Sequence, residues 1–336
     1  MARGKTSLRV LAGLTAFALA GLTACGTGGG APGASGGSGG GEKKAIGVSV
    51  ADQKSLFYVA AVQGMQAQAE KRGYKLVVTS ANNNSSQQVS QVNDLLTQQV
   101  GALIFTSQDS TAAAAGVKAA NKAQVPVIAV DQRPESGQGE LATYIATDSV
   151  KAARELCTWM FQQMGGSGEI AILHGVLGST AEIQRTQGCQ EAIKATPGIK
   201  VVAEETANWD ETEAFKATQN ILAAHPQLKA VFGESDAMGL GAAKAAQQAN
   251  RHDGMQFVGI DGFPTMFDGV KAGLTQATMA QQPYHMGEIA VDNAIQIMEG
   301  GAALPAEQYQ DTVLINKETV DQNDVTKFYG PNAKSS

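Results

Sequence analysis

The chain has 336 residues, a net charge of -6 at neutral pH and only 5% aromatic residues. That length is enough for two domains of ordinary size with a sizeable buried core. Because no basic block follows the first few residues, the charge pattern argues against nucleic acid as a partner.

The N-terminal stretch has the composition of a targeting segment followed by a tether. Residues 1–9 are basic and lack acids, and residues 10–22 form an apolar run too short for a comfortable membrane span. The run ends in Leu-Thr-Ala-Cys, which resembles the bacterial lipoprotein signal, so residues 1–25 are expected to end at a lipidated Cys25. An ordinary secretory signal with an incidental cysteine is the alternative. The Gly/Ser-rich residues 26–43 predict a flexible tether, so the folded part is expected outside the cytoplasm, lipid-anchored to the cell membrane.

From residue 45 onward, short apolar strands alternate with amphipathic helices. The first set of strands is expected over residues 45–50, 75–79, 102–106, 125–130 and 142–147, with helices starting near 55, 85 and 111. The second set is expected over residues 169–173, 200–204, 229–232, 256–260, 275–280 and, as the last strand, 311–315. Helices are expected over about 150–164, 181–195, 211–224, 237–249 and 284–299, with a short one from Pro264. This rhythm predicts an α/β fold with two doubly wound, Rossmann-like lobes of parallel sheet, and a ligand cleft between them.

Two aspartates stand directly after predicted buried strands. Asp261 ends the strand in Phe-Val-Gly-Ile-Asp-Gly-Phe-Pro, and Asp131 ends the strand over 125–130. Ligands of parallel sheets bind beyond the carboxyl ends of the strands, which makes both residues candidate ligand contacts. Alternatively, Asp261 caps the next helix and Asp131 starts a turn.

Cysteines and histidines give weaker indications. Cys157 and Cys189 fall on predicted helices and are either a disulfide, which an extracytoplasmic location permits, or two buried thiols. No histidine has metal-ligand spacing to another, so no metal site is expected, although His174 follows a strand and could reach the cleft. Gly-Glu-Ser-Asp-Ala at 233–237 has the setting of a nucleophile elbow but lacks its second glycine at Ala237, which argues against an enzyme with catalytic residues.

Several short motifs occur in a fixed order. They are Leu-Phe-Tyr at 56–58, Val-Asp at 130–131, Ile-Ala-Thr-Asp at 145–148, Arg-Thr-Gln-Gly at 185–188, Ala-His-Pro at 224–226, Val-Phe-Gly-Glu-Ser-Asp-Ala-Met-Gly-Leu-Gly-Ala at 231–242, Gly-Ile-Asp-Gly at 259–262 and Ala-Gln-Gln-Pro at 280–283. In this order and spacing the chain resembles the periplasmic sugar-binding proteins of ABC importers, in the ribose-binding branch, over about residues 44–317. The resemblance implies a multi-strand hinge between an N-terminal lobe (44–147 with 282–311) and a C-terminal lobe (148–281 with 312–336).

The resemblance also implies a set of ligand contacts. Aromatic rings would cover the apolar faces of a sugar, while carboxylates and an arginine bind its hydroxyl rim. The implied contacts are Ser55, Phe57, Tyr58, Asp131, Gln132, Arg185, Trp209, Ser235, Asp261 and Gln281. Taken by themselves, Tyr58 could instead be a core residue, Trp209 a surface-packed residue and Arg185 a solvated helix charge.

The identity of the sugar is left open by departures from the ribose binder, three of which fall at the implied contacts. Ser55 and Ser235 stand where that protein has asparagine, and Gln132 stands where it has arginine, although Arg133 follows directly. Since changed partners in a polar pocket change which hydroxyl pattern is satisfied, another pentose, a hexose or a cyclic polyol is an equal candidate.

The expected function is that of a lipid-anchored, monomeric solute-binding protein without cofactor. It would bind a monosaccharide or related polyol between its lobes and deliver it to an ABC permease. A sensor that presents its ligand to a membrane receptor is the alternative. A LacI-type repressor is excluded, because the lipoprotein signal and tether replace the DNA-binding headpiece.

Overall fold

Apolar runs rich in valine, isoleucine and alanine form two parallel sheets in the computed structural model, which describes residues 45–135 and 137–333. The strands of the first sheet are β1 (Ile46–Val50), β2 (Leu76–Ser80), β3 (Ala102–Phe105), β4 (Val127–Val130), β5 (Thr143–Thr147) and β11 (Glu307–Gln310). The strands of the second sheet are β6 (Ser167–His174), β7 (Gly198–Thr206), β8 (Leu228–Gly233), β9 (Gln256–Asp261), β10 (Ala277–Ala280) and β12 (Val313–Asn316).

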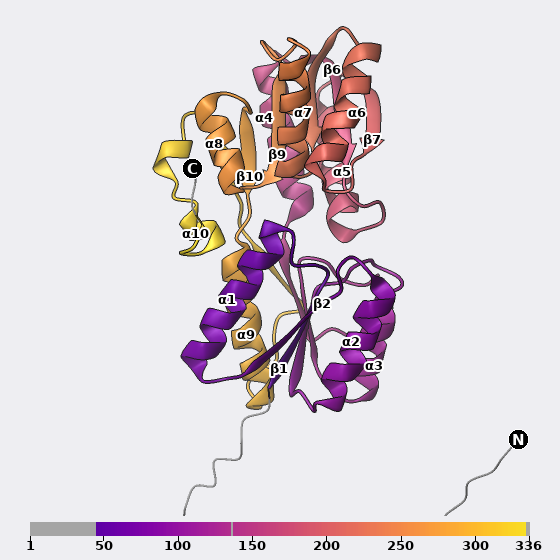
Figure 1. Cartoon of the computed structure of the whole chain (residues 1–336), viewed down its shortest axis with the longest axis vertical. Coiled ribbons are helices and arrows are strands. Elements are labelled where there is room, and N and C mark those ends of the chain that lie inside the picture. Colours follow the sequence, from indigo (N-terminus) through magenta and orange to yellow (C-terminus); the bar gives the residue numbers. More distant parts are fainter. Residues whose placement is uncertain (1–44, 136, 334–336) are drawn as a thin grey trace, which may run out of the picture. The chain divides into compact units, whose positions relative to one another are not determined.

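The two sheets have the same winding. Their strand orders are β11-β5-β4-β3-β1-β2 and β12-β10-β9-β8-β6-β7, so each lobe repeats one doubly wound topology. Every pairing is parallel except that of β12 with β10. This arrangement, seen as two lobes in Figure 1, confirms the predicted fold class.

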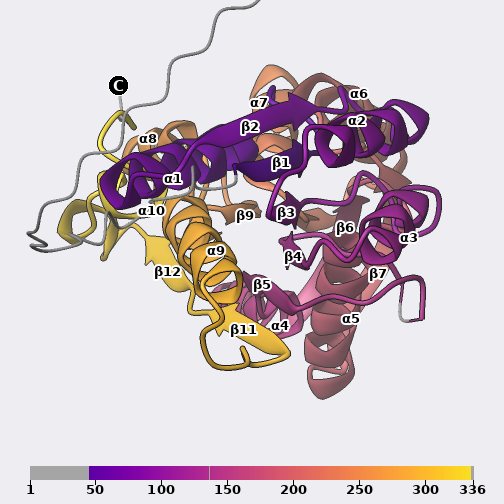
Figure 2. The same cartoon turned by 90° about the horizontal axis from the view of Figure 1, so that it is seen from below.

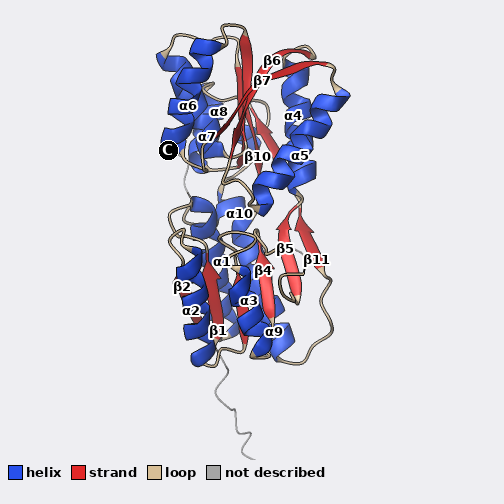
Figure 3. Cartoon of the chain, turned by 90° about the vertical axis from the view of Figure 1, so that its right-hand side faces the viewer, coloured by secondary structure: helices blue, strands red, loops and turns tan. Residues whose placement is uncertain are grey.

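Helices cover both faces of each sheet, which explains why the strands are apolar on both sides. In the first lobe, α1 (Leu56–Arg72) and α9 (Pro283–Met298) pack on one face, and α2 (Ser85–Thr97) and α3 (Ala114–Lys122) on the other (Figure 2). In the second lobe, α4 (Ser149–Gln163) and α5 (Thr180–Ala195) lie opposite α6 (Glu211–Ala224) and α7 (Asp236–Gln248), as Figure 3 shows. The remaining helices are α8 (Pro264–Ala272), η1 (Val320–Gln322) and α10 (Thr326–Tyr329).

The chain passes between the sheets three times, at residues 147–149, 280–283 and 310–313. The Thr147 hydroxyl donates to the Gln281 side-chain oxygen at 2.8 Å. The Gln282 amide donates to the carbonyl of Asp311 at 2.9 Å. These bonds tie the three passages to one another, so they form a hinge of several strands, as predicted.

The prediction of a single last strand is wrong. Two strands replace it, β11 in the first sheet and β12 in the second, because the chain crosses between the lobes at Asp311 and Thr312. The sequence of β11, Glu-Gln-Tyr-Gln, lacks the apolar alternation by which a buried strand is recognised, since this strand lies at the sheet edge beside β5.

Cys157 and Cys189 form a disulfide that joins α4 to α5, which answers the question that the sequence left open. Both residues are fully buried. None of the described helices is long and apolar enough to cross a membrane. The expected signal, lipidated Cys25 and tether lie outside the described residues.

Removing the disulfide should destabilise the protein. Replacing both cysteines with alanine should lower the free energy of unfolding by about 3–4 kcal/mol, because the cross-link spans a sequence separation of 32 residues and restricts the unfolded chain. Denaturant unfolding of the parent and the double variant measures the difference. Dithiothreitol should destabilise the parent and leave the double variant unaffected, and equal stability of the two proteins would contradict the prediction.

Candidate functional site

A cavity of about 700 Å³ lies where the carboxyl ends of the strands of the two sheets meet. Its lining includes all ten residues that the sequence indicated: Ser55, Phe57, Tyr58, Asp131, Gln132, Arg185, Trp209, Ser235, Asp261 and Gln281. These residues come from loops and helix starts of both lobes. The structure therefore brings the predicted residues together, while their contact with a ligand stays a prediction.

The first lobe contributes an aromatic pair at the start of α1. The rings of Phe57 and Tyr58 meet edge to face, with their centroids 5.4 Å apart. The Tyr58 hydroxyl donates to Asp131 at 3.1 Å and accepts from the Gln132 amide at 3.0 Å. Burial, reinforced by the charge of Asp131, raises the pKa of Tyr58, so the phenol stays a neutral donor. Tyr58 is thus both buried and part of the cavity wall.

The hydroxyl of Ser55 is not used as a helix cap. Ser55 is the N-cap of α1 but makes no side-chain capping bond. The carboxylate of Asp52 instead accepts from the amides of Lys54 and Ser55, at 2.6 and 2.8 Å. These bonds close the turn before α1, and Ser55, whose hydroxyl makes no capping bond, lines the cavity.

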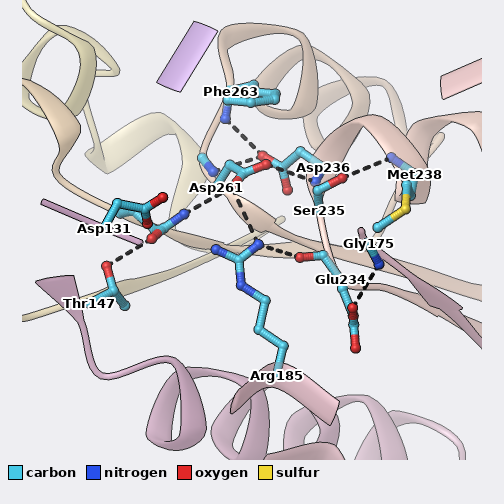
Figure 4. Close-up of polar contacts among 12 residues, drawn as sticks. Asp131, Thr147, Gly175, Arg185, Glu234, Ser235, Asp236, Met238, Asp261 and Phe263 are labelled. Atoms are coloured by element: carbon cyan, nitrogen blue, oxygen red, sulfur yellow. Dashed lines mark hydrogen bonds and ion pairs between the residues drawn. The ribbon is translucent and has the colours of Figure 1, made fainter. Parts of the chain in front are cut away.

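The second lobe contributes Asp261, the last residue of β9, which Figure 4 shows beside Arg185. Its carboxylate accepts from the Gln281 amide at 2.9 Å and from the backbone amide of Asp236 at 3.2 Å. The alternative that Asp261 caps the next helix is wrong. The N-cap of α8 is Phe263, which makes no side-chain capping bond, and the carboxylate of Asp236 accepts from the amides of Gly262 and Phe263 in the turn before the helix.

Arg185 rises from α5 into the space between Asp261 and the β8–α7 turn (Figure 4). One terminal nitrogen donates to the carbonyl of Glu234 and lies 3.6 Å from Asp261. Only 3% of the surface of Arg185 is exposed, so the alternative that it is a solvated charge on the helix is wrong. Within the described residues its buried Nε has no hydrogen-bond partner.

Three carboxylates share this single guanidinium. Burial raises the pKa of all three: that of Asp131 is raised, that of Asp236 rises to about 6 and that of Asp261 rises to about 8. The charge of Arg185 opposes each rise. Asp236 is compensated by the two amides and by the Thr278 hydroxyl at 2.6 Å. Asp131 and Asp261, which line the cavity, have fewer protein donors and retain capacity to accept hydrogen bonds.

Trp209 forms the opposite wall, in the loop before α6. Its φ is 64°, and its ring lies so close to Gly175 that a Cβ there would come within 2.0 Å of the indole. Arg185 lies 5.5 Å from the centre of the ring. Trp209 is therefore held in place by the second lobe rather than packed on an open surface.

Two further placements refine the prediction. Ser235 caps α7 by accepting from the Met238 amide at 3.4 Å while lining the cavity. Arg133 turns away from the cavity, pairing with Glu307 at 2.6 Å and stacking on Tyr144. Arg133 therefore does not replace, within the site, the arginine that the ribose binder has at the position of Gln132.

Sequence reasoning missed some of the lining. Asp52, Gln108, Asn208 and Phe263 also contact the cavity. Each follows the end of a strand, so a strict use of the strand-end rule would have found them. Gln108 has a buried side-chain oxygen without a partner among the described residues, which makes it a candidate acceptor.

Two α/β lobes with a hinge and a polar, aromatic-lined cleft define a solute-binding protein of the kind that holds a small ligand between its lobes. The comparisons agree: residues 46–302 match the model of the periplasmic binding protein domain. The chain belongs to this family, in the group of sugar- and polyol-binding proteins of ABC transporters.

Individual relatives support this assignment. The chain is 34% identical over 255 residues to the ribose import binding protein of Bacillus subtilis, covering 76% of this chain and 82% of the relative. It is 37% identical over 254 residues to the xylitol-binding protein of Mycolicibacterium smegmatis, covering 75% and 70%. A solute-binding protein from Actinobacillus succinogenes with bound D-allose superposes with a TM-score of 0.79 at 28% identity, covering 84% of this chain and 100% of the other.

These comparisons confirm three expectations. The relatives are binding proteins of transporters and not enzymes. The two-lobed fold matches that of the solved relatives. The family is one of extracytoplasmic binding proteins, in agreement with the expected side of the membrane.

The packing of Trp209 on Gly175 can be tested directly. Gly175→Ala should displace the indole, because the new methyl group would overlap its ring, and should cost about 1–3 kcal/mol of stability. In a Trp159→Phe background, which leaves one tryptophan, the fluorescence maximum should shift to the red. Gly116→Ala, which meets only Val92, serves as control. An unchanged spectrum of the Gly175 variant would contradict the assigned packing.

The buried carboxyl of Asp261 should make the ligand-free protein less stable as the pH rises. Its folded-state pKa of about 8 exceeds its ordinary value of 3.8, so between these values the folded protein holds a proton that the unfolded chain releases. Asp261→Asn, which cannot ionise, should lack this part of the loss. Thermal unfolding from about pH 5 to 8.5 should show the variant gaining a few degrees on the parent, and a constant difference would contradict the prediction.

Proposed function

We propose that this chain is the lipid-anchored solute-binding protein of an ABC importer, which binds a monosaccharide or related polyol in the cleft and delivers it to the permease. The observation that carries the proposal is the convergence of all ten indicated residues on one cavity. Donors, acceptors and aromatic faces of a sugar site are thereby present together.

The residues divide the work of holding a sugar. Phe57 and Tyr58 would cover one apolar face from the first lobe, and Trp209 would stack from the second. Asp131 and Asp261 would accept from hydroxyls, and Arg185 would donate from its guanidinium. Ser55, Gln132, Ser235 and Gln281 complete the rim.

The balance of donors and acceptors supports a ligand rich in donating hydroxyls. Gln132 already donates to Tyr58, Tyr58 donates to Asp131, and Arg133 points away. The buried charged donor of the lining is Arg185, which lies 3.6 Å from Asp261. Because the carboxyl oxygens of Asp131 and Asp261 have few protein donors, ligands with many donating hydroxyls, such as polyols and fully hydroxylated sugars, suit this set.

Closure would use the three-strand hinge. Residues 44–147 with 282–311 and residues 148–281 with 312–336 would move as lobes about it. Gln281 supports this coupling, because it bonds both Thr147 in the hinge and Asp261 in the cleft. A lipidated Cys25 and the tether over 26–43 would hold this monomeric protein at the membrane near its permease.

A screen of pentoses, hexoses, linear polyols and cyclitols by thermal shift, followed by calorimetry, tests the proposal. At least one should raise the melting temperature, since a ligand stabilises the form that binds it. Asp261→Asn should weaken that ligand by about 100-fold, because the amide replaces one acceptor oxygen with an NH₂ donor and leaves a ligand hydroxyl without its partner. Asp253→Asn, a fully exposed aspartate, is the matched control. Absence of binding by all of these compounds, or unchanged affinity in Asp261→Asn, would contradict the proposal.

A further inference from the structure

A second group of polar residues lies behind the cleft. His174 ends β6, Glu234 follows β8, and Glu182 and Thr186 stand on successive turns of α5. His174, Glu182 and Glu234 are buried, and none of them lines the ligand cavity. We call these four residues the His174 cluster.

One atom of each residue points to a common centre. His174 Nδ1 lies 3.2 Å from Glu234 Oε1 and 3.7 Å from Glu182 Oε1. Thr186 Oγ1 lies 2.6 Å from Glu234 Oε1, 3.1 Å from His174 Nδ1 and 3.4 Å from Glu182 Oε1. The edge of a tetrahedron around a metal with arms of 2.0–2.1 Å is about 3.3–3.4 Å. The five separations scatter about that value.

The remaining atom of each ligand group is anchored from outside this centre. The Gly175 amide donates to Glu234 Oε2 at 2.9 Å, which Figure 4 shows, and the Gly178 amide donates to Glu182 Oε2 at 3.0 Å. Nε2 of His174 lies 3.0 Å from the carboxylate of Glu204, on β7. Metal-binding histidines commonly direct their second nitrogen to a carboxylate in this way.

The charges also favour a cation. Glu182 and Glu234 place two buried carboxylates around one imidazole, with the half-exposed Glu204 as a third. Among the described residues, no lysine or arginine lies within ion-pair distance of any of these three glutamates. A divalent cation would compensate two of these negative charges.

We propose that the His174 cluster is a binding site for a divalent transition-metal ion of the zinc class, with His174 Nδ1, Glu182 Oε1 and Glu234 Oε1 as ligands. Thr186 or a water molecule would take the fourth position. One imidazole with two carboxylates is a ligand set that suits zinc, whereas calcium needs six to eight oxygen ligands. The half-exposed Glu204 marks the side from which an ion would enter.

No sequence motif indicates this site. The ligands come from β6, α5 and the turn after β8, so no pair of histidines and no short motif records them. Their position also connects them to the cleft. The backbone of Glu234 accepts from Arg185, and Ser235 follows in the cavity wall. Metal at the site would hold this turn in place.

Zinc binding by the metal-free protein tests the proposal without any sugar. Isothermal titration with ZnCl₂ should show one site per chain, and zinc at about 100-fold excess over Kd should raise the melting temperature by about 5 °C. Cobalt should produce the visible absorption of a tetrahedral complex. Calcium and magnesium should produce neither effect.

Three variants separate this site from adventitious binding. Glu182→Gln should lose zinc binding, and Glu204→Gln should weaken it by about 10–100-fold, as for other residues that orient a metal-binding histidine. His285→Ala is the matched control, because it removes an exposed histidine paired with Glu288. Equal zinc affinity in the parent and in Glu182→Gln, or no binding by the parent below about 100 µM, would overturn the proposal. The zinc titrations contain no sugar, so the result of the sugar screen above does not change what they show.

Discussion

Three buried carboxylates around one guanidinium are the constraint on which the second lobe's half of the cleft depends. An unpaired buried charge is costly, so each aspartate needs donors from the protein or from elsewhere. Asp236 receives two amides and a hydroxyl and becomes the structural member of the set. Asp261 receives one backbone amide and one side-chain amide, with Arg185 at 3.6 Å, and its pKa is raised further. Of these two, Asp261 is therefore the carboxylate that the fold compensates less and the one better suited to accept from a ligand.

The same network reaches the hinge. Gln281 donates to Asp261 and accepts from Thr147, so one side chain joins the cleft to two of the three passages between the lobes. The carbonyl of Asp261 also accepts from Tyr329 of α10, at 2.8 Å. A change in the hydrogen bonding of Asp261 would thus reach the segments that join the two lobes. If the lobes close on a ligand as proposed, these bonds would couple occupancy of the cleft to closure.

Much of this arrangement could be predicted from the sequence, because the period of apolar residues reports strands and the strand-end rule reports the cleft. Asp261, Asp131 and Trp209 were found on those grounds and by resemblance. β11 was not predicted, because the sequence of this edge strand, Glu-Gln-Tyr-Gln, has no apolar pattern that would indicate burial. Asp236 looked like an ordinary helix start, since its donors come from the turn after another strand. The disulfide and the His174 cluster depend on which helix faces lie together, and that is decided by tertiary packing.

Gln132 and Tyr58 show how the specificity of such a cleft is set. An arginine in place of Gln132 would add a second cation next to Asp131 and would lower the cost of ionising it. With Gln132, the partners of Asp131 are a neutral phenol and the more distant charge of Arg185. A carboxylate in that state gains more from each hydroxyl that a ligand donates, because less of its charge is already compensated. Gln132 in place of arginine therefore leaves the charge of Asp131 less compensated in the empty cleft, and it increases the discrimination of the cleft among hydroxyl patterns.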